Sequence, residues 1–183
     1  MKMDIVSAKL TRRPGVSSGI KVGGNFQVIC RDKDGREKWR DTIDNLVVNV
    51  GLQHILDIVF SGGTQIDPWY VGLTGSTPSP AAGDTMGSHA GWTEFQNYDE
   101  GTRQTWVEVR SGQSMDNSAS KAAFTISADS STIGGAFLTS DNTKGGTTGT
   151  LMAAGAFSGG DKSADDDDTL EVTYTFSAAD DGA

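Results

Sequence analysis

Residues 45–74 read NLVVNVGLQHILDIVFSGGTQIDPWYVGLT and carry the clearest helical pattern in the chain. Asn49 is a suitable N-cap, and Ser61-Gly62-Gly63 can end the helix because glycine adopts the left-handed C-cap conformation at little cost. Between these signals, apolar residues recur at three- and four-residue spacing, which indicates a helix with one apolar face. They are Leu52, Ile55, Leu56, Val59 and Phe60. We expect this face to pack into the protein core.

Beyond this helix the chain has the pattern of strands and turns. After Pro68, residues 69–74 are too short and too rich in aromatic and branched side chains for a helix, so they predict a buried strand. The hydrophobic fraction is only 36%, and Gly, Ser, Thr, Ala and Asp make up the difference. We expect a mainly β protein: an antiparallel β-sandwich or jelly roll over residues 25–183, with one short helix near residues 50–60.

Several strands can be placed by alternation and turn residues. Residues 26–43 predict a hairpin that turns at residues 32–35, and residues 92–110 predict two strands around a turn at residues 99–101. Four further strands are expected in the Ser-, Thr- and Gly-rich second half, over residues 123–127, 132–139, 149–157 and 169–177.

Charge is distributed unevenly along the chain. Residues 1–40 contain ten Lys or Arg and four Asp or Glu, a net charge of +6, whereas the remaining residues have a net charge of −15. We interpret residues 1–24 as an extended N-terminal arm, and the best candidates for contact with an acidic partner are its side chains Lys9, Arg12, Arg13 and Lys21. The alternative is that the basic residues only form the solvated face of a hairpin. The acidic body makes nucleic acid an unfavourable partner.

The sequence has no recognisable catalytic, nucleotide-binding or metal-binding motif, so we expect neither an enzyme nor a cofactor. The single cysteine, Cys30, lies mid-strand and is expected to be a small buried apolar residue. His54 and His89 are expected on the helix surface and in a loop. The acidic run at residues 165–168 lacks the spacing of a calcium loop, which favours a solvated turn over a loosely bound cation. Neither a signal peptide nor a membrane span is expected.

Aromatic residues are concentrated between residues 92 and 106. Trp92, Tyr98 and Trp106 could stack on sugars if they were exposed, and would then form a glycan-binding surface. Packing in the core or between subunits is the alternative that we favour, because aromatic side chains are usually buried.

Five segments between residues 45 and 177 resemble small structural proteins of tailed-phage virions, especially capsid decoration or cement proteins and related head or tail accessory proteins. The segments are residues 49–52 (NVGL), residues 69–74 (WYVGLT), residues 92–95 (WTEF) with Tyr98 and Arg103, residues 133–138 (IGGAFL) and residues 170–175 (LEVTYT). The arm lies outside the resemblance.

The resemblance implies a non-enzymatic virion protein that binds and stabilises the assembled capsid shell. Its implied partners are the major capsid protein or other virion proteins, with further copies of itself in a homo-oligomer. The alternative is a tail- or fibre-associated virion protein with a glycan- or receptor-binding surface.

Overall fold

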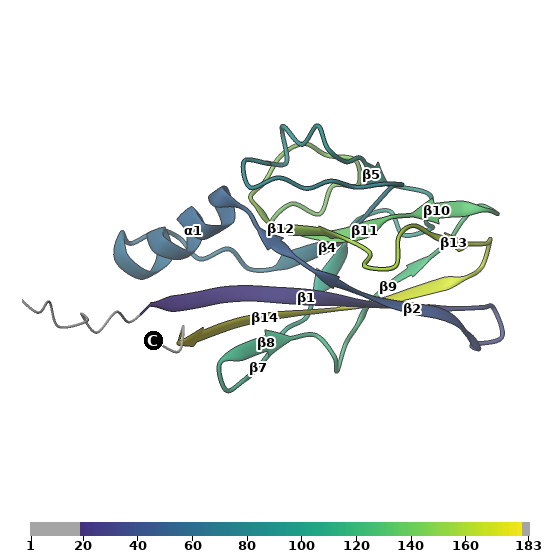
Figure 1. The fold of residues 1–183 in the computed structure, drawn as a ribbon, viewed down its shortest axis with the longest axis horizontal. Helices are drawn as coiled ribbons and strands as arrows, with labels where there is room; N and C mark the ends of the chain where they lie inside the picture. The colour runs from purple at the N-terminus through teal and green to yellow at the C-terminus, as the bar shows by residue number, and fades with distance from the viewer. Residues whose placement is uncertain (1–18, 181–183) are drawn as a thin grey trace, which may run out of the picture.

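A computed structural model describes residues 19–180, and in this part the chain is mainly β with a single helix (Figure 1). All paired strands are antiparallel. The first sheet has the order β2 (Glu37–Asp44), β1 (Ile20–Arg31), β14 (Thr169–Asp180), β8 (Ser114–Asp116) and β7 (Val109–Ser111), and β9 (Ala122–Thr125) also pairs with β14. The second has the order β3 (Leu46–Val47), β12 (Leu151–Ala156), β11 (Gly135–Thr139), β4 (Trp69–Thr74) and β5 (Glu94–Phe95), and β6 (Gln104–Trp106) also pairs with β4. A small ribbon joins β10 (Ser131–Ile133) to β13 (Lys162–Ala164).

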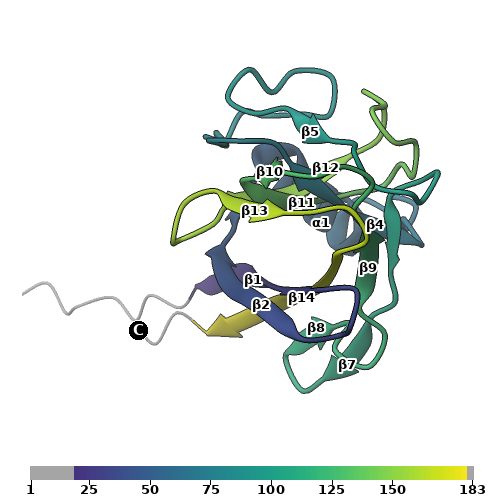
Figure 2. The same cartoon turned by 90° about the vertical axis from the view of Figure 1, so that its right-hand side faces the viewer.

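The two large sheets face each other and share one core (Figure 2). Phe26 and Val28 from β1 are fully buried in the same apolar cluster as Val71 and Leu73 from β4. Alternation along β1 and β14 explains this arrangement, because every second side chain of a strand points to the same face of its sheet. Burial of those side chains stabilises the fold by roughly 25 cal/mol for each Å² of apolar surface removed from water.

The strand β1 begins inside the region that we assigned to the arm. It pairs with β14 from Ile20 to Arg31, so residues 20–24 belong to the first sheet and not to an arm. β2 joins β1 only from Asn25 onward. Within residues 19–180, the start of β1 therefore has a neighbouring strand on one side and not on the other.

The helix α1 spans Asn49–Phe60 and lies at the end of the molecule where β1 begins (Figure 1). Its end is as predicted, since Ser61 is the C-cap residue and Gly62 has a φ of 68°. Its start differs: Asn49 is the first helical residue, and Val48 is the N-cap without a side-chain hydrogen bond. The predicted burial of its apolar face is wrong for Leu56, Val59 and Phe60, which are exposed, whereas Leu52 is half-buried and Ile55 packs against the core. Within α1 only Gly51 is buried, because β12 contacts this end of the helix.

The predicted strands are present with changed partners or boundaries. The hairpin at residues 26–43 is confirmed, and Gly35 in its turn has a φ of 81°. Residues 92–110 hold β5 and β6 on either side of the predicted turn, and each pairs with β4. The predicted strand at residues 132–139 is divided at Gly134 into β10 and β11, which belong to different sheets.

Candidate functional site: an apolar cleft beside the helix

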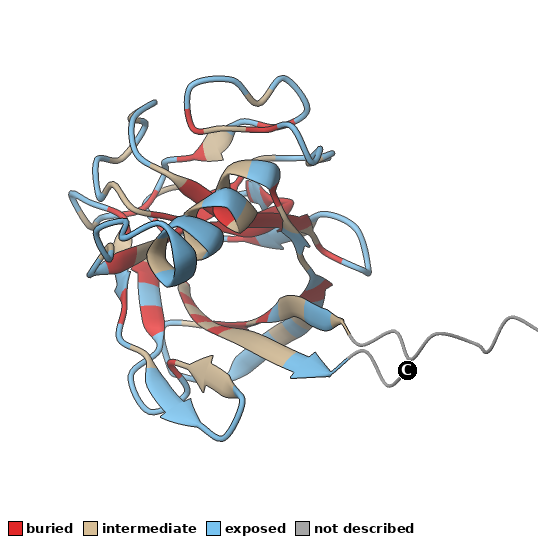
Figure 3. Ribbon diagram, turned by 90° about the vertical axis from the view of Figure 1, so that its left-hand side faces the viewer, coloured by how far each residue is buried: buried red, intermediate tan, exposed pale blue. Residues whose placement is uncertain are grey.

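Much of the apolar face of α1 is exposed, although most large apolar side chains of the domain are buried. Leu56 is 55% exposed, Val59 62% and Phe60 78%. Ile20, at the start of β1, is 80% exposed. These four side chains lie at the same end of the molecule, where Figure 3 shows α1 coloured mostly as exposed or intermediate. Leaving this apolar area in water has a free-energy cost that contact with another molecule would remove.

A groove of about 340 Å³ separates α1 from the start of β1, and we call it the α1 groove. Ile20 and Val22 of β1 form one wall, because they alternate with Lys21 and point to the same face of the sheet as Phe26. The helix forms the other wall. The groove is lined by Ile20, Val22, Leu52, Ile55, Leu56, Val59 and Phe60.

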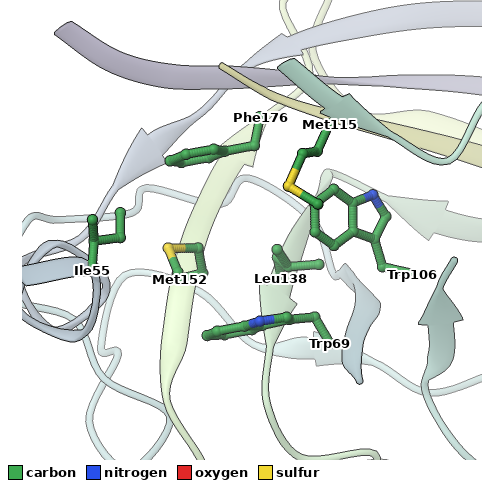
Figure 4. Close-up of a pocket in the computed structure, with 7 residues that line it drawn as sticks. All are labelled: Ile55, Trp69, Trp106, Met115, Leu138, Met152 and Phe176. Carbon is green, nitrogen blue, oxygen red and sulfur yellow. The ribbon is translucent and has the colours of Figure 1, made fainter. Parts of the chain in front are cut away.

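A smaller pocket of about 140 Å³ lies next to the groove, between the two sheets (Figure 4). Ile55 lines both spaces and stands at the helix side of the pocket, opposite Trp106. Phe176 from the first sheet faces Met152 from the second across the pocket. The remaining lining residues are Trp69, Met115 and Leu138. Groove and pocket together form an apolar cleft at one end of the core.

The chemistry of the cleft suits binding. Every side chain that lines the groove or the pocket is aliphatic, aromatic or a methionine, so none of them can act as an acid, a base or a nucleophile. No charged side chain is among the residues that line the groove or the pocket, but two carboxylates lie beside them. Asp57 projects from α1, and Asp180 is the cross-strand neighbour of Ile20. The cleft therefore offers an apolar surface with an acidic edge.

The basic residues predicted to contact a partner are only partly within the described structure. Lys9, Arg12 and Arg13 lie outside residues 19–180. Lys21 is in β1 and is exposed, but it alternates with Ile20 and Val22 and so faces away from the groove.

The aromatic residues considered for glycan binding are buried and do not form one surface. The indole N–H of Trp92 donates to Asp84 Oδ2 at 3.0 Å, and that of Trp106 donates to the carbonyl of Tyr174 at 3.0 Å. Tyr98 packs edge-on against Phe124 with ring centroids 5.0 Å apart. These rings are core residues, so they cannot serve as an exposed stacking platform.

The carboxylates near these rings have structural partners. Glu94 pairs with Arg103, and Glu100 accepts hydrogen bonds from the backbone N–H and the hydroxyl of Thr125. Among residues 19–180, no group of three or more His, Cys, Asp or Glu side chains has the arrangement of a metal site. His54 packs against Trp69, and His89 stacks on Trp92 with centroids 3.8 Å apart.

The acidic run at residues 165–168 forms a turn that pairs with a lysine. Lys38 Nζ donates to Asp165 Oδ2 at 2.9 Å and to Asp168 Oδ2 at 2.5 Å. Hydrogen bonds from Lys38 hold the pKa of Asp165 below its usual range, and the two carboxylates raise the pKa of Lys38. Asp168 is buried, so the run is not simply a solvated turn. The positive charge beside Asp165 and Asp168 therefore comes from the side chain of Lys38.

Sequence reasoning identified the helix wall of the α1 groove and misjudged its environment. The five helix residues were recognised as one face but assigned to the core. Ile20 and Val22 were assigned to the arm, although a signal was present: they continue the two-residue alternation of Phe26 and Val28 backward through Gly24. Exposure of the face depends on what lies opposite it, which helical spacing does not report.

No protein-family model matches the chain, and a comparison with curated proteins also finds no match. Within residues 19–180, α1 is too short to cross a bilayer, and no longer apolar helix occurs.

Proposed function

We propose that this chain is a non-enzymatic structural protein of a tailed-phage virion, of the capsid decoration or cement kind. We further propose that its two sheets form a β-sandwich or jelly roll. Its partners would be the major capsid protein or other virion proteins, together with further copies of itself, and its location would be the virion. The resemblance of the five sequence segments supports this assignment, as does a domain built from antiparallel sheets.

The observation that carries the proposal is the exposed apolar cleft beside α1. Four well-exposed apolar side chains gather at one end of an otherwise acidic domain. Contiguous apolar patches on soluble proteins mark sites of interaction with other macromolecules. A protein that binds only the assembled shell stabilises that shell by mass action, which is the physical basis of a cement function.

The polar residues also favour a structural role over catalysis. Glu94, Glu100, Asp165 and Asp168 each bond to a group that holds the fold together. The two spaces of the cleft are lined by apolar side chains, which bind without supplying reactive groups. The alternative of a glycan-binding fibre protein depended on Trp92, Tyr98 and Trp106, and their burial removes its basis.

Co-sedimentation with capsids tests the proposal. Capsids assembled from the major capsid protein of the source phage, without accessory proteins, should bind the purified full-length chain and gain heat resistance. Phe60→Asp should weaken binding at least tenfold, because it places a charge in the apolar cleft through which the chain contacts its partners in the shell, which include further copies of itself. Val107→Asp is the control, since Val107 is an exposed apolar residue at 48% that lines neither the groove nor the pocket. Failure of the unaltered chain to sediment with the capsids would refute the proposal.

A further inference from the structure

We propose that the α1 groove is a strand-acceptor site for residues 4–10 of a second copy of this chain. This inference rests on the proposed function in one respect: a virion accessory protein is present as many neighbouring copies. It identifies the molecule that fills the groove and the way in which that molecule is held.

The first argument is an unpaired strand edge beside the groove. The strand β1 pairs with β14 from Ile20 onward, but it pairs with β2 only from Asn25 onward. The backbone N–H of Asn45 donates to the carbonyl of Gly24 at 3.4 Å, and from there the chain continues through β3 to α1. In the described part of the chain, residues 20–23 therefore have a strand on one side only. Such an edge presents backbone donors and acceptors that an added strand can pair with.

The second argument is the shape of the groove. A space between a helix and a strand edge admits a narrow extended chain, whose backbone pairs with β1 while alternate side chains enter the groove. The same face of another copy would be a poor occupant, because two concave surfaces pressed together leave the groove unfilled. Close packing is needed before apolar contact contributes its full dispersion energy.

The third argument is the sequence that precedes β1. Residues 4–10 read DIVSAKL, and alternation places Val6, Ala8 and Leu10 on one side of an extended segment. Those side chains match the apolar lining of the groove. The segment also matches its charge: residues 1–18 have four Lys or Arg and one Asp, whereas residues 19–180 have eleven Lys or Arg and twenty-two Asp or Glu.

The fourth argument is reach. Nine residues lie between Leu10 and Ile20, so the two are ten residue steps apart and up to about 35 Å when extended. The radius of gyration of a domain of this size is about 15 Å, so the segment can cross to a neighbouring copy. Each copy has one segment and one groove. Two copies can therefore exchange segments reciprocally, and after the first contact the second becomes intramolecular and is strengthened accordingly.

The test uses the purified full-length chain without capsids, so its result does not depend on whether the chain binds a virion. Light scattering coupled to size-exclusion chromatography should show an oligomer. Val6→Asp/Leu10→Asp in the segment and Leu56→Asp in the groove should each convert it to a monomer. Ser7→Asp, on the opposite side of the segment, should leave the oligomer intact. Leu56 is already half exposed, so circular dichroism should confirm that its variant stays folded.

Disulfide trapping then identifies which chain supplies the segment. A chain with Ala8→Cys, mixed with a chain with Leu56→Cys, should form a disulfide-linked pair of the two different chains on a non-reducing gel. The native Cys30 is buried and should not take part. A doubly substituted chain that links only to itself would overturn the proposal, because the segment would then fill its own groove. A monomeric unaltered chain, or an oligomer that survives both sets of Asp substitutions, would also overturn it.

Discussion

Arg103 and Glu94 form a bidentate ion pair inside the protein. Arg103 Nε lies 2.9 Å from Glu94 Oε1 and Nη2 lies 2.7 Å from Oε2, with side chains that are 0% and 7% exposed. The same guanidinium donates to the carbonyls of Asp141 at 2.8 Å and Gly146 at 2.7 Å. One side chain thus ties β5 to the loop between β11 and β12, and satisfies its own donors in doing so.

Replacing Arg103 by Met should destabilise the fold by about 3–5 kcal/mol, because Glu94 would remain buried without its partner. Urea unfolding followed by tryptophan fluorescence measures this change. Arg110→Met is the control: Arg110 is exposed, so its loss should change the free energy of unfolding by less than about 0.5 kcal/mol. Equal effects of the two substitutions would contradict a structural role for the buried pair.

Gly72 is expected to tolerate no side chain. A Cβ at this position in β4 would lie 2.2 Å from Cζ of the Phe137 ring, which is closer than van der Waals contact permits. Gly72→Ala should therefore cost about 1–3 kcal/mol of stability, measured by thermal or urea unfolding. Gly101→Ala serves as the control, since a Cβ there meets nothing within 4 Å. A neutral Gly72→Ala would show that the sheet adjusts at low cost.

Leu56 and Leu73 should respond differently to the same truncation. Leu73 is fully buried in β4, so Leu73→Ala should cost about 2–5 kcal/mol. Leu56→Ala, on the exposed face of α1, should change the stability of the isolated chain by less than about 0.5 kcal/mol. Chemical denaturation at low protein concentration makes the comparison. A large loss of unfolding free energy for Leu56→Ala under these conditions would mean that the α1 groove is already filled in the isolated chain.

Asp141 should make stability depend on pH in acid. Hydrogen bonds from the Thr148 hydroxyl, and then from Thr143, lower the pKa of Asp141 to about 2. The pKa in the folded state is below the unfolded value of about 3.9, so the stabilisation is present above about pH 4 and is lost as the pH falls toward 2. Asp141→Asn should flatten the plot of unfolding free energy against pH in this window. Thr148→Val should move the loss of stability to higher pH. If the variants gave curves of unfolding free energy against pH parallel to that of the unaltered chain, Asp141 would not be the group responsible.

The thiol of Cys30 should be unreactive in the folded protein. Burial, followed by the nearby charge of Asp168, raises its pKa to about 12, so almost no thiolate forms near neutral pH. Ellman's reagent at pH 8 should react slowly with the native chain and rapidly in 8 M urea, with urea serving as the internal control. A rapid reaction of Ellman's reagent with the native chain would indicate that β1 opens locally at Cys30.

The sequence by itself determined most local features of this protein. Alternation marked β14 and β1 from Phe26 onward, and aromatic and branched residues marked β4. The residues around Gly35 marked a tight turn, and three- and four-residue spacing followed by glycines marked α1 and its end. These features depend on neighbours in the chain, where backbone preference and side-chain period act directly. The burial of Cys30 was also predictable, because it lies in register with Phe26 and Val28.

Only the tertiary structure decided which surfaces are covered and which distant residues meet. Helical spacing grouped Leu56 with Phe60 but did not show that the face lacks a cover within residues 19–180. It also could not show that Lys38 reaches Asp168, which is 130 residues away. Burial and ion pairing depend on contacts between distant segments, whereas periodicity reports only which residues share a face. For this reason the sequence predicted the helix, and the tertiary structure showed it to be one wall of an open groove.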